Sequence, residues 1–145
     1  EATFQDREFR RNTARKMVED GLMQGYLVYS GGAAIGWCNA GDKVDYGPIM
    51  AEGEFETMKN PHRGQIKVVY CFELAPGYRG KGISHQLLEQ IIQDAKEEGY
   101  SWLEAYPFAD RDFEYQYHGP VPLYEKHGFV QIAEKSWFRI MQRKL

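Results

Sequence analysis

The sequence contains little cysteine: Cys38 and Cys71 are the only two in 145 residues. Two cysteines are too few for the disulfide framework of a small secreted domain, and no Cys/His spacing typical of metal ligands accompanies them. Both lie in apolar, strand-like runs. This pattern is typical of free buried thiols in a cytosolic protein, so we expect a cytoplasmic protein without a metal site.

The sequence also lacks long hydrophobic runs and an excess of positive charge. No apolar run approaches the roughly 18 residues that a membrane-spanning helix needs. The 18 Lys and Arg residues are outnumbered by 21 Asp and Glu residues, giving a net charge of −3, whereas nucleic-acid-binding domains are usually basic. We therefore expect no membrane and no nucleic-acid partner. With no repeat or linker visible, residues 1–145 are predicted to form one domain.

A strand, a turn and a helix follow one another in the middle of the chain. Residues 65–74 are rich in β-branched and aromatic side chains, which predicts a buried strand, and Ala75-Pro76-Gly77 ends it. The next apolar residues recur at helical spacing on one face up to Gly99, a suitable C-terminal cap. They are Ile83, Leu87, Leu88, Ile91, Ile92 and Ala95.

The segment that joins this strand to this helix, residues 79–84, has the composition of a phosphate-binding turn. Gly80 and Gly82 allow the main chain to approach a ligand closely, and the first turn of a helix presents unpaired N–H groups at the positive end of its dipole. Arg79 and Lys81 add positive charge. The segment matches neither the dinucleotide-binding fingerprint nor the P-loop; its pattern is Arg-x-x-Gly-x-small.

The remaining elements are predicted from periodicity and turn residues. Residues 8–20 are expected to form a helix, and residues 25–30 and 33–39 a hairpin across Gly31-Gly32. A long surface loop is expected over 40–64, a strand over 100–106 and an aromatic, acidic loop over 108–122. A short helix then begins near Pro122 and ends before Gly128, followed by strands over 130–132 and 136–141.

A second motif, Leu-Tyr-Glu-Lys-His-Gly-Phe, occupies residues 123–129. Together with residues 79–84, it resembles the two signatures of the GNAT superfamily of acyl-CoA-dependent N-acetyltransferases, although Ser84 and Tyr117 replace the usual Gly or Ala and the usual Asn. The resemblance implies an α/β (α+β) fold with a mixed, mostly antiparallel central sheet flanked by helices. Acyl-CoA would bind between splayed fourth and fifth strands. It also implies a strand before the first helix, which residues 1–7 do not resemble, so that strand is expected to be missing.

The resemblance further implies which residues hold acetyl-CoA. The turn would bind the diphosphate, and the main chain near Phe72 and Leu74 would pair with the pantetheine arm as an added strand does. The residues implied are Phe72, Leu74, Arg79, Gly80, Lys81, Gly82, Ile83 and Ser84.

Two residues are the catalytic candidates. The resemblance implies that the phenol of Tyr124 gives a proton to the departing thiolate. Glu73 is the candidate base, because alternation along the strand would place it with Val69 and Cys71 on one face, and burial there would raise its pKa. Glu104, His118 and a water relay remain alternatives for the base.

The acceptor is less well defined by the sequence. Aromatic and acidic residues are dense between Tyr100 and Tyr124, and such side chains suit a cationic amine. Trp37, Asn39, Tyr106 and Tyr117 are the candidate substrate-binding residues. We expect an N-acetyltransferase acting on a small-molecule or peptide amine, as a monomer or homodimer. A non-catalytic acyl-CoA-binding module and a nucleotide-phosphate binder are the alternatives.

Overall fold

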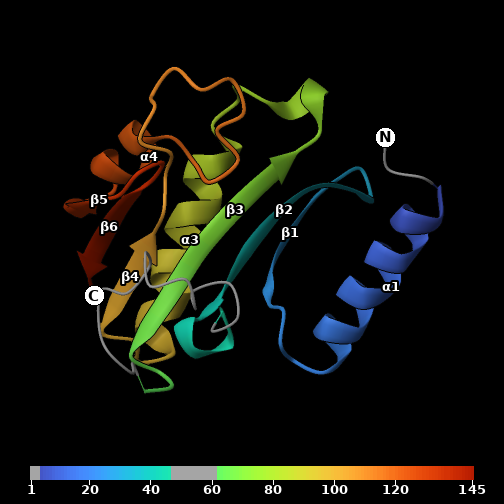
Figure 1. The fold of residues 1–145 in the computed structure, drawn as a ribbon, viewed down its shortest axis with the longest axis horizontal. Helices are drawn as coiled ribbons and strands as arrows, with labels where there is room; N and C mark the ends of the chain where they lie inside the picture. The colour runs from blue at the N-terminus through green and yellow to red at the C-terminus, as the bar shows by residue number, and fades with distance from the viewer. Residues whose placement is uncertain (1–3, 47–61) are drawn as a thin grey trace.

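The computed structural model describes residues 4–46 and 62–145, and it contains one six-stranded sheet with helices around it (Figure 1). The strands are β1 (Gly25–Ser30), β2 (Ala33–Asp42), β3 (Ile66–Leu74), β4 (Trp102–Ala105), β5 (Val130–Glu134) and β6 (Arg139–Lys144). The helices are α1 (Phe4–Glu19), α3 (Ile83–Glu97) and α4 (Val121–Lys126), with short 3-10 turns η1 (Lys43–Tyr46) and η2 (Pro76–Tyr78).

The strand order is β1-β2-β3-β4-β6-β5, and only the β3–β4 pair is parallel among the described strands. The predicted fold class, a mixed and mostly antiparallel sheet flanked by helices, is confirmed. Within the described residues, α1 is the first element and stands beyond the edge strand β1 (Figure 1).

Several element boundaries differ from the predictions. Helix α1 begins at Phe4 rather than at residue 8, and β5 continues to Glu134 rather than ending at residue 132. Strand β2 continues to Asp42 and is followed by η1, so the expected loop begins later than residue 40, and residues 47–61 of that loop lie outside the described part. Strand β6 begins at Arg139 rather than Ser136, because Phe138 forms only an isolated bridge with Phe108 before the regular β5–β6 pairing starts.

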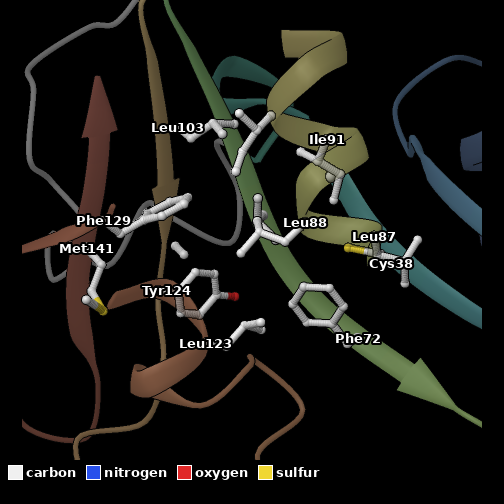
Figure 2. Close-up of a cluster of buried hydrophobic side chains, with 14 of the residues drawn as sticks. Cys38, Phe72, Leu87, Leu88, Ile91, Leu103, Leu123, Tyr124, Phe129 and Met141 are labelled. Atoms are coloured by element: carbon white, nitrogen blue, oxygen red, sulfur yellow. The ribbon is translucent and has the colours of Figure 1, made fainter. Parts of the chain in front are cut away.

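Helix α3 covers one face of the sheet, and its apolar stripe forms the larger part of the core. Its buried residues Leu87, Leu88 and Ile91 pack with residues of β3, β4 and α4, including Phe72 and Tyr124 (Figure 2). A second, smaller cluster of Tyr46, Val68, Tyr106, Phe138 and Ile140 forms a separate part of the core.

A β-bulge in β3 interrupts the alternation of its side chains. In the pairing with β2, Asn39 lies opposite Cys71 and Ala40 lies opposite Val69, so Tyr70 is an extra residue. Val69 and Phe72, three residues apart, therefore both pack in the larger core cluster. Because a bulge shifts every following side chain to the other face, the prediction that Val69 and Glu73 share a face is wrong.

The parallel pairing of β3 with β4 is short, and the two strands separate beyond it. It runs from Ile66 opposite Trp102 to Val69 opposite Ala105, where β4 ends. Strand β3 continues to Leu74 with β2 on one side only. This is the splayed strand pair predicted from the sequence, where the two strands are the fourth and fifth if a preceding strand is counted.

Candidate functional site

A cavity of about 640 Å³ lies between the free end of β3, the turn before α3 and the loop that precedes α4. Of the residues predicted to hold the cofactor, Phe72, Leu74, Arg79, Gly80 and Ser84 line it. The opposite wall is formed by residues 113–117 and Pro120. The cavity therefore joins the glycine turn to the splayed edge of β3.

Three predicted cofactor residues do not line the cavity but belong to the same turn. Gly82 caps the N-terminus of α3, Ile83 opens the helix and packs partly against the core, and Lys81 places its ammonium 5.7 Å from the ring centre of Tyr78. These residues position the turn, and the charge of Lys81 lies next to it.

The turn has the backbone geometry of an anion-binding segment. Gly80 and Gly82 have φ values of +72° and +79°, a region that favours glycine. Apart from their chain neighbours, no atom of the described residues lies within 4 Å of the position where a Cβ would stand on either. In the part of the chain that the structure describes, no side chain caps the N-terminus of α3, so these residues leave N–H groups of its first turn without a capping side chain. The Arg79 side chain folds back, and its Nε donates to the carbonyl of Leu74 at 3.0 Å.

The loop before α4 bonds to the edge of β3 where β4 has ended. The N–H of Phe72 donates to the carbonyl of Tyr117 at 2.7 Å, and Nδ1 of His118 donates to the carbonyl of Tyr70 at 2.6 Å. The loop thus provides hydrogen-bond partners for two main-chain groups of β3 at the edge where β3 and β4 separate. A ligand that pairs with the N–H of Phe72 has to take the place of the Tyr117 carbonyl.

Tyr124 lies one layer behind the cavity. Its side chain is fully buried and packs in the same cluster as Phe72 (Figure 2). Its phenol donates to the carbonyl of His118 at 2.6 Å. Burial raises the pKa of Tyr124 well above its ordinary value. The close approach of the phenol requires Gly119, because a Cβ there would lie 2.7 Å from the phenol oxygen.

Glu73 stands at the mouth of the cavity and is exposed. It lies directly opposite Trp37 in the β2–β3 register. The expectation that Glu73 is buried is therefore wrong, and with it the reason given for a raised pKa.

Glu104 and Tyr106 belong to the interior rather than to the cavity. Both are fully buried, and the Glu104 carboxylate accepts hydrogen bonds from Lys43, Tyr106 and Gln142 at 2.5, 2.6 and 2.6 Å. Glu104 is thus held as part of a buried ionic network, which argues against a role as the base. The proposed substrate role of Tyr106 is likewise corrected, because its side chain does not reach the cavity lining.

The other candidate substrate-binding residues differ in how close they lie to the cavity. Tyr117 lines the cavity and is partly exposed. Trp37 lines an adjoining hollow that also includes Glu73 and Leu74. Asn39 is half-buried, and its Oδ1 accepts a hydrogen bond from the phenol of Tyr46 at 2.6 Å.

His118 lies deeper, among aromatic rings. Its ring centre lies 4.5 to 6.1 Å from those of Tyr70, Phe108, Tyr117 and Trp137. Because Nδ1 donates to a carbonyl, the neutral ring carries its hydrogen there and keeps a lone pair on Nε2.

The sequence pattern did not identify four residues of this loop as site residues, although they line the cavity: Phe113, Glu114, Tyr115 and Gln116. Their alternation of aromatic and polar side chains was visible in the sequence. What was not visible was that this segment crosses the end of β3, since no periodicity specifies the path of a loop.

We expect the stability of the protein to fall in mild acid because of His118. Burial lowers the pKa of His118, so the unfolded chain binds a proton near pH 6.5 while the folded chain still resists it. The free energy of unfolding should therefore decrease as the pH falls from about 7.5 through 6.5. Urea unfolding at several pH values should show a flatter profile for His118→Asn, which keeps a donor but does not titrate.

His127 serves as the control, because burial and the neighbouring His85 also lower its pKa. It is half-buried, whereas His118 is buried, so screening by solvent should leave His127 a smaller share of the pH dependence. A wild-type slope in His118→Asn, with a flattened slope in His127→Asn, would contradict the assignment.

Two further findings concern the described residues only. No group of three or more His, Cys, Asp or Glu side chains in residues 4–46 and 62–145 is arranged to hold a metal ion. None of the helices in these ranges has the length and apolar character that crossing a membrane requires.

Comparison with known proteins identifies the family to which the chain belongs. The sequence pattern described as the acetyltransferase (GNAT) family matches residues 1–129. No curated protein matches the chain.

Solved structures share the fold at low sequence identity. A GNAT family acetyltransferase from Elizabethkingia anophelis with acetyl-CoA bound is 16% identical, covers 90% of this chain and 83% of its own, and has a TM-score of 0.60. The PaiA N-acetyltransferase from Thermoplasma acidophilum in complex with coenzyme A is 15% identical, with coverages of 92% and 68% and a TM-score of 0.62. The ribosomal-protein-alanine N-acetyltransferase from Brucella melitensis is 21% identical, with coverages of 95% and 78% and a TM-score of 0.57.

Proposed function

The chain belongs to the acetyltransferase (GNAT) family, and on that premise we propose that it transfers an acetyl group from acetyl-CoA to a primary amine. The observation that carries the proposal is the cavity of about 640 Å³, which connects the turn at Gly80 with the unpaired end of β3 at Phe72 and Leu74. A diphosphate and an extended arm need these two features side by side. The two cysteines are free thiols, which supports a cytoplasmic location.

The residues of the turn fit the diphosphate. Main-chain N–H groups of the first turn of α3, reached past Gly80 and Gly82, would bind its oxygens, and Arg79 and Lys81 would balance its charge. Ile83 and Ser84 would hold the start of the helix in place. On β3, the N–H of Phe72 would exchange its bond to the Tyr117 carbonyl for one to the arm, with Leu74 continuing the pairing.

The reaction removes two protons from the acceptor's ammonium group and supplies one to sulfur. Bound acetyl-CoA supplies an activated acyl group. The ammonium group first loses one proton to solvent and becomes a neutral amine. Its nitrogen then forms a bond to the acyl carbon as the carbon–sulfur bond breaks; the departing sulfur gains a proton, and the second proton lost by the nitrogen restores the group that gave it.

Tyr124 and Glu73 are the residues that we assign to these proton transfers. Because burial raises its pKa, the phenol of Tyr124 stays protonated at neutral pH and can donate, once it releases the His118 carbonyl. Glu73, at the cavity mouth, would receive the ammonium group and pass its proton to solvent. His118 Nε2 and a water relay remain alternatives to Glu73 for removing the proton from the acceptor.

The first experiment compares Gly82→Ala with Gly99→Ala. The two glycines have φ values of +79° and +84°, no neighbour within 4 Å, and places at opposite ends of α3, so the substitutions introduce similar strain. We expect Gly82→Ala to weaken acetyl-CoA binding by about tenfold or more, because its Cβ enters the diphosphate cradle. Gly99→Ala should bind as the wild type does. Isothermal titration calorimetry measures both affinities.

Turnover decides between the enzyme and the non-catalytic module. Thiol release from acetyl-CoA is measured with a panel of primary amines. Tight binding without thiol release from any amine would favour a non-catalytic acyl-CoA-binding module instead. Equal affinities of Gly82→Ala and Gly99→Ala would remove the turn from the binding site.

A further inference from the structure

The wall of the cavity that faces β3 and the glycine turn combines aromatic rings with an acidic residue. Residues 113–117 and Pro120 form this wall, and Glu114 is the charged residue on it among the described lining residues. The other two charged lining residues, Arg79 and Glu73, belong to the turn and to β3, and they also share an adjoining hollow. Once the turn and the edge of β3 are assigned to acetyl-CoA, the aromatic wall remains for the acceptor.

The aromatic residues of this wall are exposed, although their rings lie close to one another. Phe113, Tyr115 and Tyr117 line the cavity with 40%, 63% and 44% of their surface accessible. Phe108 lies 4.7 Å from Phe113 and 5.0 Å from Tyr117 between ring centres, and Phe113 lies 6.2 Å from Tyr115. Aromatic side chains left accessible beside a cavity are typical of a recognition surface.

One side chain of the loop that presents these rings bonds several of the loop's own carbonyls. Nε2 of Gln116 lies within hydrogen-bond distance of the carbonyls of Asp110, Arg111 and Phe113, at 3.0, 3.4 and 2.9 Å. Such bonding restrains the loop from within. A preorganised set of rings loses less conformational entropy when a ligand binds.

The remaining room limits the size of the acceptor. A cavity of about 640 Å³ is within the usual range of about 300–1,000 Å³ for a small-molecule site, and here it must also receive the pantetheine arm. What is left suits a body about the size of one ring. Two carboxylates beside three rings match a single ammonium group on an apolar body better than a polycation.

From this arrangement, and resting on the proposed function, we propose that the acceptor is a small primary amine with an aromatic body. The ring of the acceptor stacks among Phe113, Tyr115 and Tyr117, while Glu73 and Glu114 face its ammonium group.

The test compares four probes of acetyl-CoA-dependent thiol release: 2-phenylethylamine, ethanolamine, spermidine and a short peptide with a free N-terminus. We expect kcat/KM for 2-phenylethylamine to exceed that for ethanolamine at least tenfold. Tyr115→Ala should reduce this ratio at least fivefold, because the ring that it removes contacts only the aromatic probe. Glu114→Gln should lower kcat/KM for 2-phenylethylamine by raising KM.

Tyr29→Ala is the matched control, because Tyr29 on β1 is 61% exposed, nearly as much as Tyr115, and is not part of the cavity lining. It should leave the ratio unchanged. Faster turnover of spermidine, ethanolamine or the peptide than of 2-phenylethylamine would overturn this inference and leave the proposed function intact. Thiol release with none of the four, together with no acetyl-CoA binding, would overturn the proposed function and this inference with it.

Discussion

Replacing Lys43 by methionine is expected to lower the free energy of unfolding by about 3–5 kcal/mol. Lys43 is 5% exposed, and its ammonium lies 2.5 Å from the carboxylate of Glu104, which is fully buried. Without the ammonium, a negative charge remains in the interior, where burial makes it costly. Urea-induced unfolding followed by circular dichroism measures the loss.

The control is Lys16→Met, which removes a similar ion pair from the surface. Lys16 bonds Asp20 at 2.8 Å, but both side chains are largely exposed, so we expect a change within about 0.5 kcal/mol. The double variant Lys43→Met with Glu104→Gln should recover part of the loss, because it removes the buried charge. Equal stability of Lys43→Met and Lys16→Met would show that Glu104 is solvated or neutral in the folded protein.

Glu104 illustrates what the sequence could and could not predict. An acidic residue in an apolar strand near the motifs is a reasonable candidate base, and the strand itself was predicted correctly. Its partner Lys43 lies 61 residues away on η1, and no local pattern pairs the two. A long-range ionic network and a catalytic carboxylate therefore look alike in a single sequence.

The cofactor side of the site was the more predictable part, because it depends on consecutive residues. The strand, the glycine turn and α3 are specified by composition, by turn residues and by helical spacing within residues 65–99. The five predicted cofactor-binding residues that line the cavity all belong to this segment.

It was harder to predict which side chains of β3 lie on which face of the sheet beyond the bulge, because this depends on the register with β2. The face of Glu73 was predicted from regular alternation with Val69 and Cys71, which the extra residue Tyr70 breaks. The path of residues 108–120 was unpredictable for a related reason. Its bonds to Tyr70 and Phe72 form only because β4 ends at Ala105 and leaves those groups unpaired.

The largest effect on activity is expected for Tyr124→Phe, which should lower kcat about 10²-fold or more while leaving acetyl-CoA affinity within about threefold of the wild type. General acid catalysis by a positioned side chain contributes typically about 10²–10⁴-fold, and a phenylalanine fills the same space without a proton to give. The buried carbonyl of His118 would also lose its donor, at a cost of about 1–3 kcal/mol in stability, so both proteins have to be compared at a temperature where each is folded.

Tyr106→Phe separates the two effects. Like Tyr124, Tyr106 is fully buried and its phenol donates at 2.6 Å, but the acceptor is Glu104, away from the cavity. This variant should lose stability with little change in kcat. If Tyr124→Phe kept wild-type kcat as well, the phenol would have no part in the departure of the thiolate, and its burial behind Phe72 would be a matter of packing alone. If only Tyr124→Phe lost activity, the phenol that bonds the His118 carbonyl in this structure would be the group that gives a proton to the departing thiolate.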